Sequence, residues 1–155
     1  RRLMRKNADL TREVCPPRTG REQYDLLRRY LDASHENGGM ADMTPGDYVA
    51  MVEDTAVNTF VTEYRMADGV LLACLLGDRM QDGISLVYSF FDPRAEKRSL
   101  GSFMILDQIA RAKEAGHAHI YLGYLIEDCR KMAYKKRFAP LQRLGQDGWE
   151  DYHLG

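Results

Sequence analysis

The fold is decided by residues 57–91, which read VNTFVTEYRMADGVLLACLLGDRMQDGISLVYSFF. Three segments within them are rich in β-branched, aromatic or aliphatic residues, as strands are: Val57–Met66, Val70–Leu76 and Ile84–Phe91. The tight-turn signals Asp68-Gly69 and Gln81-Asp82-Gly83 separate these segments. Strands joined by such short turns run antiparallel. Residues 57–91 therefore predict three consecutive antiparallel strands.

Two helices are predicted before this stretch. Thr19-Gly20-Arg21-Glu22 has the spacing of a capping box, and the helix that it starts should end before Asn37-Gly38-Gly39. Thr44-Pro45-Gly46-Asp47 signals a second helix start, with proline at the first helical position.

A helix, a strand and a further helix are predicted after the stretch, over Ser99–Ala115, His117–Ile126 and Glu127–Phe138. Trp149 and Tyr152 indicate a short final strand. A strand–helix–strand crossover joins parallel strands, so the sheet is predicted to be mixed. The order is three antiparallel strands and then helix–strand–helix. This α/β arrangement resembles the GNAT (acyl-CoA N-acyltransferase) fold.

The composition is that of an ordinary globular protein. The 155 residues are 45% hydrophobic and 29% charged, which predicts one domain over residues 1–155. No apolar run is long enough to span a bilayer and no signal segment is present, so we expect a cytoplasmic protein without a membrane partner. The chain opens with Arg1 inside a basic run, which indicates a piece of a longer protein.

The near-neutral net charge of −1 hides two basic clusters, at residues 1–6 and 130–137. Such clusters can bind a polyanion locally, although a solvated helix face is the ordinary alternative. The cysteines and histidines offer no ligand set with metal-site spacing. We therefore expect neither a metal nor a cofactor.

The start of the helix at Ser99 is the first candidate site. Arg98-Ser99-Leu100-Gly101-Ser102-Phe103 partly matches the R/Q-x-x-G-x-G/A pattern with which GNAT enzymes bind coenzyme A phosphates on helix N–H groups. Phe103 replaces the small final residue, and we expect its ring to crowd a pyrophosphate. The alternative is that Ser99 caps the helix and Gly101 eases its entry.

The predicted final helix is the second candidate site. At about 100° per residue it gathers Arg130, Tyr134 and Arg137 on one side, with Lys131 and Lys135 opposite. A tyrosine between arginines suits the binding of phosphate or of a developing anion. The alternative is an amphipathic helix whose tyrosine covers the edge of the core.

Four motifs together identify a family resemblance: Tyr88-Ser89-Phe90-Phe91-Asp92-Pro93, Ser99-Leu100-Gly101-Ser102-Phe103, Tyr121-Leu122-Gly123-Tyr124 and Cys129-Arg130-Lys131-Met132-Ala133-Tyr134-Lys135. With them the chain resembles the C-terminal region of the aminoacyl-tRNA–protein transferases and looks most like the bacterial aspartate/glutamate leucyltransferases. The family carries a cysteine-bearing region upstream of the arginine-rich start, and that region is absent from this chain.

The resemblance implies transfer of leucine or arginine from aminoacyl-tRNA to proteins that begin with Asp or Glu, which marks them for N-degron degradation. It makes Tyr134 the candidate proton donor and places the oxyanion at Ser99 and Gly101. Residues expected to bind the substrates are Arg98, Tyr88, Asp92, Tyr124, Arg130 and Lys131. Those expected to contact tRNA phosphates are Arg1, Arg2, Arg5, Lys6, Lys135, Lys136 and Arg137.

Two other functions remain open from the sequence. One is a coenzyme A-dependent GNAT N-acetyltransferase. The other is an inactive fragment that binds tRNA or the N-degron.

Overall fold

The computed structural model describes residues 1–33, 42–123 and 134–153. These residues form two compact units, Arg1–Tyr121 and Leu122–Gly155, which are described separately. The prediction of one domain over the whole chain stays a prediction.

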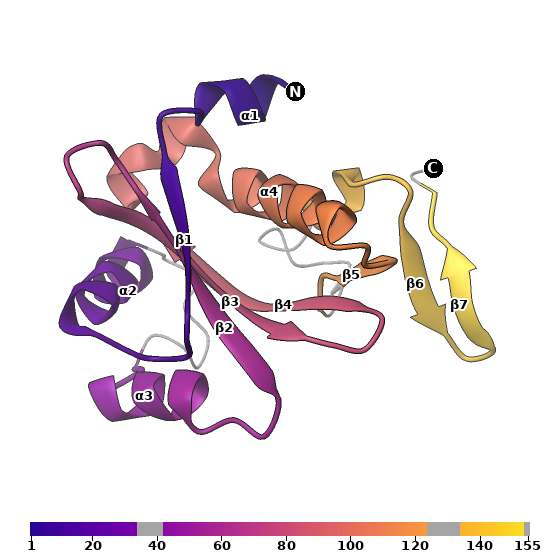
Figure 1. Cartoon of the computed structure of the whole chain (residues 1–155), viewed down its shortest axis with the longest axis horizontal. Helices are drawn as coiled ribbons and strands as arrows, with labels where there is room; N and C mark the ends of the chain where they lie inside the picture. The colour runs from indigo at the N-terminus through magenta and orange to yellow at the C-terminus, as the bar shows by residue number, and fades with distance from the viewer. Residues whose placement is uncertain (34–41, 124–133, 154–155) are drawn as a thin grey trace. The chain divides into compact units, whose positions relative to one another are not determined.

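A five-stranded sheet in the order β1-β2-β3-β4-β5 forms the centre of the first unit (Figure 1). Its strands are β1 Thr11–Cys15, β2 Asn58–Arg65, β3 Leu71–Arg79, β4 Gly83–Phe91 and β5 His119–Tyr121. Neighbouring strands run antiparallel except β4 and β5, which are parallel. The predicted mixed sheet with three consecutive antiparallel strands is confirmed.

Helices cover both faces of this sheet, as Figure 1 shows. They are α1 Arg2–Lys6, α2 Arg21–Ala33, α3 Pro45–Glu53, the 3₁₀ helix η1 Pro93–Arg98 and α4 Leu100–Glu114. Cys74 and Leu76 of β3 pack in a core cluster with residues of α2 and α3, whereas Leu75 packs in a cluster with residues of α4. Because both faces are covered, β3 is a continuous apolar run rather than an alternating one.

The helix start predicted at Thr44 is confirmed, and a capping box forms there. Thr44 Oγ1 accepts from the Asp47 N–H at 3.1 Å, and the Asp47 carboxylate accepts from the Thr44 N–H at 2.9 Å. The box predicted between Thr19 and Glu22 is wrong. Thr19 donates instead to Glu53 at 2.7 and 2.8 Å, and Glu22 pairs with Arg65 at 2.7 Å, because tertiary partners compete for these side chains.

The helices α1 and η1 and the strands β1 and β6 were not predicted. Strand β1 pairs with β2 from Thr11↔Arg65 to Cys15↔Val61. Most of β1 is exposed, so it carries no alternating apolar pattern from which a strand could be predicted. At the other edge of the sheet, β5 is shorter than the predicted strand over His117–Ile126, and residues 124–126 lie outside the described residues.

The second unit contains the 3₁₀ helix η2, Tyr134–Arg137, and a hairpin of β6 Gln142–Gly145 and β7 Gly148–Asp151. The α-helix predicted over Glu127–Phe138 is therefore wrong at its described end, where Pro140 leaves little room for a regular helix. The final strand predicted from Trp149 is confirmed. Within the described residues of the chain, no helix is long and apolar enough to cross a membrane.

Candidate functional site

Strand β4 is paired along only part of the edge that it shares with β5. Strand β5 pairs with β4 only over Gly83–Ser85, although β4 continues to Phe91. Leu76 of β3 lies opposite Tyr88 and Gly77 opposite Leu86, so Val87 is an extra residue in β4. Such a bulge bends a strand and redirects its side chains. Within the described part of the chain, no strand pairs with β4 beyond Ser85 along the edge that faces away from β3.

Asp92 organises the loop that follows β4. It is buried, and its N–H donates to the Leu72 carbonyl at 2.9 Å. Its carboxylate accepts three hydrogen bonds from Arg94, from the backbone N–H at 2.9 Å, Nε at 3.0 Å and Nη2 at 2.8 Å. These bonds hold the pKa of Asp92 below its ordinary value. Asp92 thus caps η1 and sets the path from β4 to α4.

Ser99 joins η1 to α4 in a left-handed conformation, with φ 53° and ψ 50°. It is the N-cap of α4, but its side chain makes no capping bond, so the expectation that Ser99 caps the helix with its side chain is wrong. Its carbonyl accepts from the Phe103 N–H at 3.0 Å. The first N–H groups of α4, including that of Gly101, have no acceptor within the helix, so they can stabilise an anion.

The ring of Phe103 lies in the core. It packs edge-on against Tyr64, with ring centroids 5.6 Å apart, and the residue is buried. The expectation that this ring crowds a ligand at the helix start is therefore wrong. One helical turn after Ser99, the side chain points towards the sheet, and the absence of a small residue here does not argue against coenzyme A.

The basic helix α1 lies beside the junction of η1 and α4, and hydrogen bonds join the two (Figure 1). Buried Asn7 donates to the Arg98 carbonyl at 3.0 Å, and Lys6 donates to the Lys97 carbonyl. Arg98 in turn donates two 2.8 Å hydrogen bonds to Asp9, which lower the pKa of Asp9. The cluster predicted to contact tRNA phosphates thus lies next to the start of α4: Arg1, Arg2, Arg5 and Lys6. The Arg98 side chain forms an ion pair with Asp9. The predicted role of Arg98 in substrate binding stays a prediction.

Aromatic side chains lie on the α2 side of the same strand end. Tyr88 packs against the cluster formed with α2, and burial raises its pKa to about 12, so its phenol is neutral at physiological pH. Tyr30 of α2 contacts Phe91, with ring centroids 5.1 Å apart. Arg29, which the sequence analysis missed, places Nε 4.0 Å from Oδ2 of Asp92.

The remaining predicted residues belong to the second unit or lie outside the described residues. Tyr134, Lys135, Lys136 and Arg137 belong to η2 in the second unit, where Lys135 donates to the Leu122 carbonyl at 2.7 Å. Tyr124, Arg130 and Lys131 lie outside the described residues. The roles predicted for all of them stay predictions.

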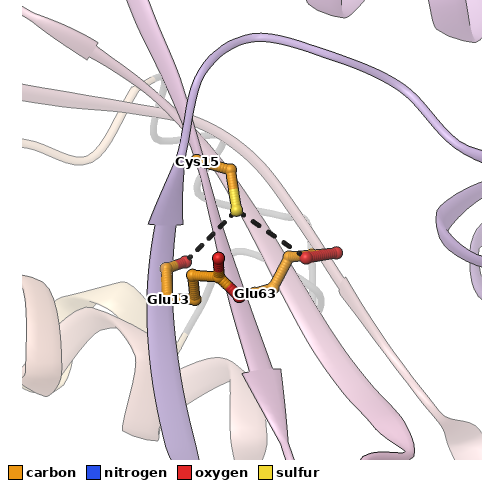
Figure 2. Close-up of side chains that lie close together, drawn as sticks. All are labelled: Glu13, Cys15 and Glu63. Atoms are coloured by element: carbon orange, nitrogen blue, oxygen red, sulfur yellow. Dashed lines mark hydrogen bonds between the residues drawn. The ribbon is translucent and has the colours of Figure 1, made fainter.

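One cluster of possible metal ligands lies elsewhere, on β1 and β2: Glu13, Cys15 and Glu63 (Figure 2). The Cys15 thiol donates to the Glu13 carbonyl at 3.8 Å and to the Glu63 carboxylate at 3.7 Å. Burial and the two nearby carboxylates raise the pKa of Cys15 to about 11, so the thiol is protonated at neutral pH. Glu63 also accepts from Arg65 at 3.2 Å. These hydrogen bonds within the protein explain why the three side chains lie close together.

Known proteins resemble this chain over nearly its whole length. It is 53% identical over 149 residues to the aspartate/glutamate leucyltransferase of Parvibaculum lavamentivorans, covering 96% of the chain and 62% of that protein. It is 50% identical over 164 residues to the enzyme of the same name from Sinorhizobium medicae, covering 99% of the chain and 63% of that protein. The chain thus spans under two thirds of the length of these relatives.

The fold prediction is confirmed by solved structures. The ribosomal-protein-S18-alanine N-acetyltransferase from Escherichia coli superposes with a TM-score of 0.58 at 13% identity, over 91% of this chain and 89% of that one. A family model described as "Arginine-tRNA-protein transferase, C terminus" matches residues 22–145. The chain therefore belongs to the family of arginine-tRNA-protein transferase C-terminal domains.

Proposed function

We propose that the protein carrying this chain transfers leucine from aminoacyl-tRNA to the α-amino group of proteins that begin with Asp or Glu. The observation that carries the proposal is the position of basic α1 beside the start of α4. Asn7, directly after α1, is hydrogen-bonded to the Arg98 carbonyl there. This arrangement offers phosphate contacts next to helix N–H groups that can stabilise an anion. The leucine donor and the acidic acceptor follow from the names of the relatives.

The reaction is aminolysis of an ester. The α-amine attacks the aminoacyl carbonyl carbon, the new amide C–N bond forms, and the bond to the ribose oxygen breaks. The amine loses a proton and the ribose oxygen gains one. Because an α-amine has a pKa of about 7.7–8.0, a fraction of it is already neutral at pH 7 and no strong base is required.

The chain's contribution is then to hold the substrates and stabilise the tetrahedral intermediate. The N–H groups at the start of α4, including that of Gly101, suit the oxyanion, and Tyr134 is the proposed donor of the proton to ribose. We assign the acceptor stem to α1 and to Lys135, Lys136 and Arg137. The modified proteins would enter the N-degron pathway in the cytoplasm.

The test is to offer three labelled donors with one Asp-led peptide: leucyl-tRNA, arginyl-tRNA and acetyl-coenzyme A. We expect label in the peptide from leucyl-tRNA only. Label from acetyl-coenzyme A alone would replace the proposal with a GNAT acetyltransferase. Binding of tRNA without any transfer would leave a binding protein.

A further inference from the structure

Arg29 is a cation at the end of β4 whose hydrogen-bond donors remain available. Its Nε lies 4.0 Å from Oδ2 of Asp92, beyond hydrogen-bond distance, and its side chain is 43% exposed. Arg94 already supplies three hydrogen bonds to Asp92. Within the described residues, no other ion pair or hydrogen bond of the Arg29 side chain is found.

The Arg29–Asp92–Arg94 cluster therefore combines two guanidinium groups with one carboxylate and carries an excess positive charge. The Asp92 side chain is 4% exposed, whereas that of Arg94 is 77% exposed. A guanidinium group presents a planar fork of donors that matches a carboxylate. The cluster can accept a second carboxylate from solvent without losing the Arg94–Asp92 bonds.

Arg29 comes from α2, whose buried residues pack in the core cluster on one face of the sheet. Tyr30, next to Arg29 in α2, contacts Phe91, and Tyr88 packs in the core cluster of α2. Met4 of α1 and Leu10, which follows α1, pack against the core cluster with α4, as does Phe91. A polyanion on α1 and a small acidic group at Arg29 would thus be bound by residues of two different helices, α1 and α2.

We propose that Arg29 binds the acidic side chain of the acceptor's first residue, with Asp92 and Arg94 holding the cluster in place. This inference rests on the proposed function, because it assumes that the acceptor begins with Asp or Glu. A carboxylate suits Arg29 because one guanidinium group beside the buried Asp92 presents a planar fork of donors, whereas a polyanion requires the larger group of cations that α1 carries.

The test compares Arg29→Gln with Arg21→Gln in the full-length protein. Arg21 is a matched control because it lies in the same helix and its side chain is 94% exposed. Two peptides that differ only in Asp or Asn as first residue carry a dye at the carboxyl end, and their binding is measured by fluorescence anisotropy without tRNA. Thermal melting confirms that each variant is folded.

We expect the unchanged protein and Arg21→Gln to prefer the Asp-led peptide by about ten-fold or more, as charge-assisted hydrogen bonds do. Arg29→Gln should bind both peptides equally, at the affinity that the unchanged protein has for the Asn-led peptide. Arg29→Lys should restore part of the preference, because it returns the charge without the fork. The affinity for leucyl-tRNA should not change.

The inference is overturned if Arg29→Gln keeps the Asp preference, if the unchanged protein has none, or if the variant weakens binding of leucyl-tRNA instead. Because peptide binding is measured without transfer, the two proposals fail separately. A preference that depends on Arg29 in a protein that transfers no leucine would contradict the proposed activity and support the assignment of Arg29. Leucine transfer together with a preference for Asp that does not depend on Arg29 would support the proposed activity and contradict the assignment of Arg29.

Discussion

Arg98 and Asp9 are joined by two hydrogen bonds of 2.8 Å, although 89 residues separate them in the chain. The pair closes the connection between the end of α1 and the start of α4, and buried Asn7 supports it from the same segment. Arg98 begins the stretch that partly matches the phosphate-binding pattern of GNAT enzymes, and its ion pair with Asp9 holds basic α1 beside that stretch. The Arg98 guanidinium group thus stabilises the local structure, and its bonds to Asp9 compete with any direct contact between Arg98 and a substrate.

Arg98→Gln and Asp9→Asn should therefore have the same effect on local structure. We expect both to increase amide hydrogen exchange over Asn7–Leu10 to a similar extent, and the double variant to add nothing. Because half of the Asp9 side chain is exposed, the free energy of unfolding should change by at most about 1 kcal/mol. Weaker binding of an Asp-led peptide in Arg98→Gln alone would instead make Arg98 a reader of the acidic side chain.

Ser99 should tolerate loss of its hydroxyl group and gain from loss of its Cβ. Its side chain makes no capping bond, so Ser99→Ala should alter the free energy of unfolding by less than about 0.5 kcal/mol. Ser99→Gly should stabilise the protein by up to about 1 kcal/mol, because glycine adopts positive φ without strain. Urea unfolding measures both changes. A loss of 1 kcal/mol or more in Ser99→Ala would show that the hydroxyl does cap α4.

Asp92 should make stability depend on pH at the acidic end. Arg94 holds its folded-state pKa below the ordinary value, so the stabilisation is complete above about pH 5 and is lost as pH falls through the folded-state pKa. At pH 7 we expect Asp92→Asn to cost about 1.5–3 kcal/mol, the range for a hydrogen bond to a charged group. The difference between Asp92→Asn and the unchanged protein should shrink between pH 5 and pH 3. A constant difference would exclude the charge of Asp92 as its cause.

The basic residues of α1 should determine how strongly salt weakens tRNA binding. Replacing Arg2 and Arg5 together by Gln should reduce the slope of log K against log salt by about 2, one unit for each phosphate contact. Lys136 and Arg137 replaced together should act in the same direction, whereas Arg21→Gln should not. Filter binding of leucyl-tRNA from about 50 to 200 mM salt measures the slope. An unaltered slope would place the acceptor stem elsewhere.

Tyr134 should matter for the rate of transfer and not for tRNA binding. Tyr134→Phe removes the proposed donor of the ribose proton while keeping the ring, so we expect kcat to fall by about a hundred-fold, within the range for general acid catalysis. The Kd for leucyl-tRNA should stay within two-fold or so of its original value. Single-turnover transfer at saturating peptide separates the two effects. An unchanged rate would remove Tyr134 from the mechanism.

Local patterns in the sequence were sufficient for most of the first unit. The turn signals at Asp68-Gly69 and Gln81-Asp82-Gly83, and the apolar runs beside them, act over a few residues, so the three antiparallel strands and α4 could be predicted. The box at Thr44 formed because its partner Asp47 lies three residues away. The capping box predicted at Thr19 did not form, because distant Glu53 binds Thr19 instead.

The sequence by itself determined the order of α2, α3, β2, β3, β4, α4 and β5 and the place of Ser99 at a helix start, because these depend on neighbouring residues. Only the tertiary structure decided that exposed β1 joins the sheet, that Arg98 meets Asp9, and that Arg29 lies beside Asp92. Such contacts join side chains tens of residues apart, and no local period in the chain encodes which of several arginines reaches a given carboxylate. Physical proximity after folding selects the partner.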